Sequence, residues 1–140
     1  MTARRNKALV RRWLEEVWGK GNLAVVDEMA GADFVWHWAP PGVGNDREGY
    51  KRFLKLDFEA FADVSCATED IVADGDRVAS RWTWRGTHKG GFMGVAPTGK
   101  QVVLTGICIN RFVGGKIVEE WGEMDMMGMM QQLGAVPPSG

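Results

Sequence analysis

Apolar residues recur at helical spacing near the start of the chain. Between Asn6 and Trp18 they fall three or four positions apart, and charged residues occupy the opposite side. Two glycines follow as stop signals, so the pattern predicts an amphipathic first helix. Asn22 is a residue type that can cap a second, short helix over residues 22–30.

A short aromatic strand and a third helix are predicted next. Residues 34–38 favour a strand, and the proline- and glycine-rich stretch after them breaks it. Asp46 can cap a helix over residues 47–63, where aromatic and leucine side chains follow the helical period approximately.

Long strands are predicted for the second half of the chain. They cover about residues 64–73, 76–86, 101–113 and 116–125. Asp-Gly-Asp at 74–76 and Gly-Gly at 114–115 suit the tight turns of antiparallel hairpins. Arg77, Arg81 and Arg85 alternate with mostly apolar residues, so one face of their strand is charged and the other faces a core.

Helices first and long strands afterwards indicate an α+β fold, with the helices on one face of a curved sheet. A methionine-rich stretch near the end predicts a short terminal helix. No repeat or linker divides the chain, so we expect a single domain over 1–140, with a core at 6–134 and a loose tail at 135–140.

Charge and length exclude several classes of partner. The 140 residues carry a formal charge of -1 without a long basic run, which gives no indication of nucleic acid or an anionic membrane. The first residues are charged where a signal peptide is apolar, and no apolar run approaches the roughly 20 residues of a membrane span. We therefore expect a cytoplasmic protein. Cys66 and Cys108 lack metal-ligand spacing and are interpreted as small apolar fillers.

The chain contains seven tryptophans and one tyrosine. An indole ring is large and carries one N–H donor, so it suits a pocket wall as well as a core. Alternation along residues 36–38 places His37 opposite Trp36 and Trp38, so either the histidine or the indole pair faces inward.

The stretch RGTHKGGFMGVAPTGK, residues 85–100, is too rich in glycine for a helix and too long for a tight turn. Connections of this length often serve as lids or binding loops. Its glycines permit a bend over a pocket mouth, and Phe92 and Met93 supply an apolar plug. His88 would enter the site when such a lid closes.

Three motifs in the chain resemble one known family. They are the Gly-x-His-x-Gly…Gly-x-x-Pro-Thr loop within 86–98, the GGKIVEEW hairpin at 114–121 and the closing QQLG at 131–134. Together they resemble the SnoaL-like polyketide cyclase, or ester cyclase, family of the nuclear transport factor two-like superfamily, over about Asn6 to Gly134. The resemblance implies a cone-shaped α+β barrel, in which a curved, mostly antiparallel sheet wraps around the N-terminal helices and encloses a pocket. It also implies a homodimer formed through the sheet.

The resemblance leaves the catalytic base open. The aldol cyclases use a strand aspartate as general base, and the matching position is Gly122, with Glu120 where relatives often have histidine. By analogy Glu120, Gly122 and Met124 face the pocket, and burial would raise the pKa of Glu120. Asp125 matches a recurrent family aspartate, or it caps the terminal helix.

The functional hypothesis is a cofactor-independent enzyme that uses acid/base proton transfer on a small apolar polyketide- or terpenoid-like substrate, by cyclisation, isomerisation or elimination. The alternatives are a small-molecule-binding protein without catalysis and an epoxide hydrolase-like enzyme that activates water. No metal, nucleic acid or membrane partner is expected. The candidate catalytic residues are His37, His88, Glu120 and Asp125. The candidate substrate contacts are Trp36, Trp38, Trp82, Trp84, Phe92, Met93, Cys108 and Met124.

Overall fold

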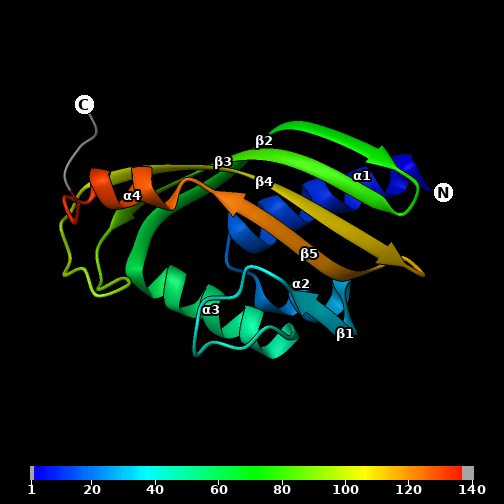
Figure 1. Ribbon diagram of the computed structural model, residues 1–140, viewed down its shortest axis with the longest axis horizontal. Coiled ribbons are helices and arrows are strands. Elements are labelled where there is room, and N and C mark those ends of the chain that lie inside the picture. Colours follow the sequence, from blue (N-terminus) through cyan, green and yellow to red (C-terminus); the bar gives the residue numbers. More distant parts are fainter. Residues whose placement is uncertain (1, 137–140) are drawn as a thin grey trace.

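Helices pack against one face of a five-stranded sheet in a computed structural model that describes residues 2–136 (Figure 1). In chain order the elements are α1 (Ala3–Trp13), the π-helical turn η1 (Leu14–Trp18), α2 (Leu23–Met29), β1 (Ala30–Trp36), α3 (Arg47–Ala60), β2 (Phe61–Asp74), β3 (Arg77–His88), β4 (Gln101–Val113), β5 (Lys116–Met124) and α4 (Met126–Gln132). The predicted α+β architecture is confirmed.

The sheet is curved and has the strand order β1-β5-β4-β3-β2 (Figure 1). β1 runs parallel to β5, and every other pair of neighbouring strands is antiparallel. α1, η1 and α3 lie across the concave face, so the helices and the inner side chains of the sheet share one core. The mostly antiparallel sheet follows the prediction.

Alternation along β3 sets which side chains reach the core. Arg77 and Arg81 are exposed, whereas Trp82 and Trp84 are buried on the opposite side. The turns that join the strands are tight, and Gly114 and Gly115 both adopt positive φ angles, 56° and 80°. Two consecutive positive φ angles suit glycine and match the twist of an antiparallel hairpin.

The helix ends differ from the predictions in two places. Asp46 caps α3 as expected, because its carboxylate accepts a hydrogen bond of 2.8 Å from the Gly49 amide. Asn22 precedes α2 but makes no capping hydrogen bond with its side chain. α3 stops at Ala60 rather than residue 63, because the chain enters β2 directly and buries Phe61 against the core.

η1 is a π-helical turn that the sequence pattern did not predict. On a regular α-helix, residues five positions apart point about 140° away from each other. The wider π turn brings Trp13 and Trp18 toward one side, where both indole N–H groups reach the hydroxyl of Tyr50. The turn therefore orients two of the seven tryptophans.

Within residues 2–136, no helix is both long enough and apolar enough to span a membrane. Most of the predicted loose tail, residues 137–140, lies outside the described residues.

Candidate active site

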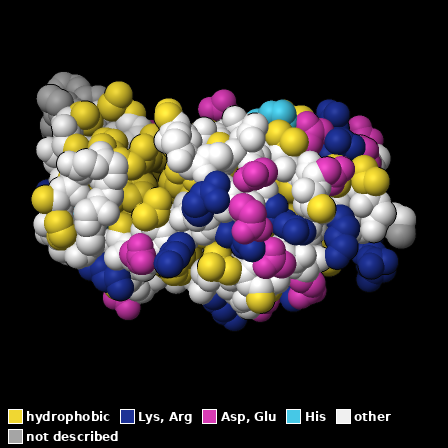
Figure 2. Space-filling model, turned by 90° about the horizontal axis from the view of Figure 1, so that it is seen from below, with side chains coloured by type: hydrophobic (Ala, Val, Ile, Leu, Met, Phe, Trp, Pro, Cys, Tyr) yellow, Lys and Arg dark blue, Asp and Glu magenta, His cyan; other side chains and the backbone are white. Residues whose placement is uncertain are grey.

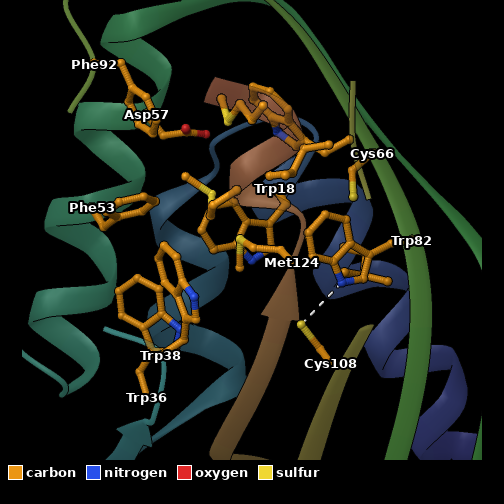
Figure 3. Close-up of a pocket in the computed structure, with 15 residues that line it drawn as sticks. Trp18, Trp36, Trp38, Phe53, Asp57, Cys66, Trp82, Phe92, Cys108 and Met124 are labelled. Carbon is orange, nitrogen blue, oxygen red and sulfur yellow. Dashed lines mark hydrogen bonds between the residues drawn. The ribbon is translucent and has the colours of Figure 1, made fainter. Parts of the chain in front are cut away.

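An apolar cavity lies between α3, the concave face of the sheet, η1 and α4 (Figure 3). It measures about 50 Å³. One water molecule needs roughly 10–15 Å³ by the same measure, so the cavity has room for only a few waters. A ligand larger than that must displace side chains as it enters. The lining residues are Leu14, Trp18, Trp36, Trp38, Phe53, Asp57, Cys66, Trp82, Trp84, Phe92, Leu104, Cys108, Met124, Met126 and Met129.

Sequence reasoning identified much of this wall. The predicted substrate contacts that line the cavity are Trp36, Trp38, Trp82, Trp84, Phe92, Cys108 and Met124. Met93 does not line it, since this residue occupies the tip of the loop and is 53% exposed. Of the two arrangements that alternation allows around His37, the structure has the one in which Trp36 and Trp38 face inward.

Asp57 is the one charged side chain among the described residues that line the cavity. It projects from α3 toward the interior, and its Oδ2 atom is buried without a hydrogen-bond partner (Figure 3). Because burial disfavours the ionised form, the pKa of Asp57 rises to about 7. A carboxyl group with this pKa can accept or donate a proton near neutral pH.

The two cysteines in the lining are poor proton carriers. Burial raises the pKa of the Cys66 thiol to about 12, and the pKa of Cys108 rises further for the same reason. Cys108 Sγ accepts a 3.3 Å hydrogen bond from the Trp82 indole. Both thiols are therefore uncharged near neutral pH, in line with the interpretation of the two cysteines as small apolar fillers.

Glu120 is buried on the inner face of β5, as predicted, but it does not line the cavity. Its carboxylate accepts hydrogen bonds from the Trp13 indole at 3.1 Å, the Tyr50 hydroxyl at 3.1 Å and the Asn110 amide at 2.9 Å. Burial raises the pKa of Glu120, and these three donors oppose that rise. The Tyr50 hydroxyl also accepts a hydrogen bond of 2.5 Å from Trp18, so the network ends in the cavity wall.

His37 lies on the opposite side of the sheet from the cavity. Its ring stacks on Trp121 with a centroid distance of 4.8 Å, and its Nε2 atom is 2.8 Å from a Glu119 carboxylate oxygen. Glu119 also accepts a hydrogen bond from Arg111. These contacts form an outer cluster, separate from the Glu120 network.

His88 is fully buried at the end of β3. Its Nδ1 atom accepts a hydrogen bond from the Thr98 amide at 3.2 Å, which leaves the proton on Nε2. Nε2 has no hydrogen-bond partner, and the ring packs against Phe61. His88 does not line the cavity, and its bond to Thr98 fixes the base of the loop.

Asp125 is exposed and accepts a 2.9 Å hydrogen bond from the Gly128 amide. It is therefore the N-cap of α4, one of the two roles expected from the sequence. At Gly122 an added Cβ atom would lie 3.2 Å from Cys108 Sγ. The cysteine thus fills space that a larger residue at position 122 would need.

The loop that follows β3 contributes Phe92 to the cavity wall. The amides of Lys89 and Gly90 both donate to the Ala60 carbonyl at the end of α3. Phe92 and Val95 exchange two backbone hydrogen bonds across a tight turn at the tip. Figure 2 shows hydrophobic side chains gathered at the end of the molecule where α4 and this loop lie, and the exposed Met93 and Met127 belong to these elements.

Sequence reasoning missed Asp57, although a signal was present. Tyr50, Phe53, Leu54 and Asp57 follow the spacing i, i+3, i+4, i+7, which places the carboxylate on the buried face of α3. A charged residue on an apolar helix face is unusual unless it is paired. Among residues 2–136 there is no cluster of three or more His, Cys, Asp or Glu side chains that could hold a metal ion.

Comparison with known proteins identifies the family. The family model for the SnoaL-like polyketide cyclase matches residues 8–133. The chain belongs to the SnoaL-like polyketide cyclase family. No curated protein matches the sequence.

Several solved structures have the same fold. IdmH from Streptomyces antibioticus, a candidate polyketide cyclase, is 34% identical with a TM-score of 0.78, covering 94% of this chain and 99% of its own. AclR from Streptomyces galilaeus, a candidate hydroxylase, is 29% identical with a TM-score of 0.87, covering 99% of this chain and 87% of its own. TsrD from Streptomyces laurentii is 24% identical with a TM-score of 0.88, covering 97% and 99%. Proteins named as cyclases and as hydroxylases thus share one fold, so the fold alone does not define the chemistry.

Proposed function

We propose that this member of the SnoaL-like family is a cofactor-independent enzyme that cyclises, isomerises or eliminates a compact, largely apolar small molecule by proton transfer. The observation that carries the proposal is a single carboxylate, Asp57, in a cavity otherwise lined by apolar and aromatic side chains. In this proposal Asp57 takes a proton from the substrate and returns it at another atom.

The environment of Asp57 supports this role. Its Oδ2 atom accepts no hydrogen bond, so little solvation must be removed before the carboxylate reacts. The pKa of about 7 leaves a substantial fraction of the carboxylate ionised at neutral pH. An ionised carboxylate in apolar surroundings is a stronger base than the same group in water, because proton uptake relieves its unfavourable burial.

Glu120 has a positioning role in the proposal. The Tyr50 hydroxyl lies within hydrogen-bond distance of both Glu120 and the Trp18 indole, so Glu120 helps to fix one wall of the cavity. The carboxylate already accepts three hydrogen bonds and does not face the substrate space. We therefore assign proton transfer to Asp57 and wall orientation to Glu120.

A base-sensitive probe tests the proposal without knowledge of the natural substrate. 5-Nitrobenzisoxazole is a flat apolar molecule whose C–H proton is removed as its N–O bond breaks, which yields a coloured phenolate. We expect saturable turnover whose rate rises with pH around the pKa of about 7. Asp57→Asn should reduce the rate of this step by about 100-fold or more.

Glu59→Gln is the matched control, because Glu59 is an exposed carboxylate on the same helix. This variant should react at the wild-type rate. If the wild type binds the probe, as tryptophan fluorescence would report, but turns it over no faster than Asp57→Asn does, the catalytic proposal fails. That result would favour the small-molecule-binding alternative.

A further inference from the structure

Asp57 has no countercharge in the cavity. None of the described lining residues is Lys, Arg or His, and the Oδ2 atom of Asp57 accepts no hydrogen bond. A buried carboxylate is costly unless it is paired or satisfied by donors. Glu120, the other Asp or Glu that is buried among the described residues, has three donors by comparison. A positively charged ligand would therefore supply the partner that the Asp57 carboxylate lacks.

Aromatic rings surround the space that such a partner would occupy. Indoles and phenyl rings from η1, α3, the strands and the loop line the cavity, and Figure 3 shows several of them around its centre. They are Trp18, Trp36, Trp38, Phe53, Trp82, Trp84 and Phe92. The face of an aromatic ring attracts a cation, and tryptophan does so most strongly. Indole faces and an unpaired carboxylate thus favour the same ligand charge.

We propose that the cavity binds an organic cation with an apolar body, whose positively charged nitrogen pairs with Asp57 and lies against the indole rings. The inference rests on the same site as the proposed function and specifies its substrate class. A neutral polycyclic ligand would use the ring faces but would leave the carboxylate unpaired. A cation uses both features.

The substitution on the nitrogen follows from the shortage of acceptors. A primary ammonium group carries three N–H donors, and each needs an acceptor when it is buried. Asp57 is the one carboxylate in the described lining, and the rest of the lining side chains are aromatic, aliphatic or sulfur-containing. The site therefore fits a tertiary or quaternary ammonium ion, or an iminium ion, better than a primary amine.

A cationic substrate also suits proton transfer by Asp57. When a carbon next to an iminium group loses its proton to the carboxylate, the C–H electron pair forms a C=C bond and the C=N electrons neutralise the nitrogen. The products are a neutral enamine and a protonated Asp57, so no oxidant or cofactor is required. The positive nitrogen both acidifies the C–H bond and keeps the carboxylate ionised until transfer occurs.

A pair of ligands with the same shape and different charge tests the inference. Choline carries a trimethylammonium group, and 3,3-dimethylbutan-1-ol replaces that group with an uncharged tert-butyl group. At about pH 8.5, where Asp57 is ionised, choline should bind about tenfold more tightly or better, as measured by calorimetry and tryptophan fluorescence. At about pH 5.5 the preference should shrink, because Asp57 is then protonated.

Variants separate the charge from the shape of the site. Asp57→Asn should reduce the preference for choline to the part that the indole rings provide and make it independent of pH, and should keep the affinity for the neutral alcohol, which also reports that the cavity is intact. Glu59→Gln should retain the preference. The only other titratable side chains in the described lining are the two cysteines, whose raised pKa values keep them neutral across this range.

The two proposals fail in different ways. Equal affinity for the two ligands in the wild type at about pH 8.5, or no binding of either, would overturn the cation inference. Turnover of 5-nitrobenzisoxazole that depends on Asp57 would then still support the proposed proton transfer. A charge preference that depends on Asp57, together with binding of 5-nitrobenzisoxazole without turnover, would support the cation site and overturn the catalytic role.

Discussion

Asp57 should destabilise the folded protein above neutral pH. Its pKa lies near 3.8 in the unfolded chain and at about 7 in the fold, so the folded state holds a proton that the unfolded state has lost between these values. Stability contributed by this group is complete below about pH 4 and falls as pH rises through 7. At about pH 8.5, Asp57→Asn should therefore be more stable than the wild type.

The gain should lie between about 1 and 4 kcal/mol, since each pKa unit corresponds to about 1.4 kcal/mol. Urea unfolding of both proteins at about pH 8.5 and about pH 5 measures it. Glu120 also has a raised pKa, but it is present in both proteins and cancels in the difference. A difference in stability that stays constant with pH would contradict the assignment.

Tyr50 should have a larger stabilising role than its single hydroxyl suggests. Tyr50→Phe keeps the aromatic contacts but removes a buried group that bonds to Trp13, Trp18 and Glu120. The loss leaves buried donors and an acceptor with fewer partners, which should cost about 1–3 kcal/mol in the free energy of unfolding. Chemical denaturation measures the change.

Thr83→Val provides the comparison for that experiment. Its hydroxyl donates to Glu69 at an exposed position, so its removal should change stability by less than about 0.5 kcal/mol. If Tyr50→Phe costs no more than Thr83→Val, the network around Glu120 is not a stabilising unit.

Side-chain direction could be predicted within an element but not between elements. Period-two alternation grouped Glu120 with Met124 on one face of β5, and the family resemblance indicated that this face is the inner one; Glu120 is buried and Met124 lies in the cavity wall. The spatial neighbours of Glu120 are Trp13, Tyr50 and Asn110, which come from three different elements. No local sequence pattern indicates that these donors surround Glu120 or that the Oδ2 atom of Asp57 has no hydrogen-bond donor.

Gly90 fixes the loop against α3 by its lack of a side chain. A Cβ atom there would lie 2.8 Å from the carbonyl oxygen of Glu59, which is backbone and cannot move freely. Gly90→Ala should therefore displace residues 89–97 and loosen Phe92 in the cavity wall. Hydrogen exchange at the Lys89 and residue 90 amides should accelerate, because both donate to Ala60.

Gly91→Ala is the control for this loop. An added Cβ atom there meets nothing closer than 3.8 Å, and its φ angle is not positive. Exchange in this variant should match the wild type. If Gly90→Ala also leaves exchange unchanged, the docking of the loop on α3 does not hold the loop in place.

The element boundaries match the predictions where a capping residue or a turn glycine sets them. Asp46 caps α3, and the glycine turns at 75 and 114–115 end the strands where predicted. The π-helical turn at Leu14–Trp18 was not predictable, because its residues also fit an ordinary amphipathic helix. Both indoles bond to Tyr50, a contact between distant segments, and this contact favours the wider turn.

The outward face of the sheet has an apolar stripe along its central strand. Val103, Ile107, Ile109 and Val113 point away from the helices on β4 and are 37–55% exposed. Arg81 pairs with Asp70 and Arg111 with Glu119 on this side, whereas Arg85 and Glu123, the ladder partners of Val103 and Ile107, have no ion pair within the described residues but carry opposite charges. A second copy of the same face would therefore cover apolar surface without strong charge repulsion.

We expect the protein to be a homodimer that buries this stripe. Light scattering at micromolar concentration should give twice the monomer mass of 15.5 kDa. Ile107→Asp should shift the equilibrium to monomer, because two-fold symmetry places the new carboxylate in the interface twice. Met127→Asp is the control, since Met127 is equally apolar and 62% exposed but lies on α4 at the end of the molecule. A wild-type monomer, or a dimer that Ile107→Asp leaves intact and Met127→Asp dissociates, would show that the sheet face is not the interface.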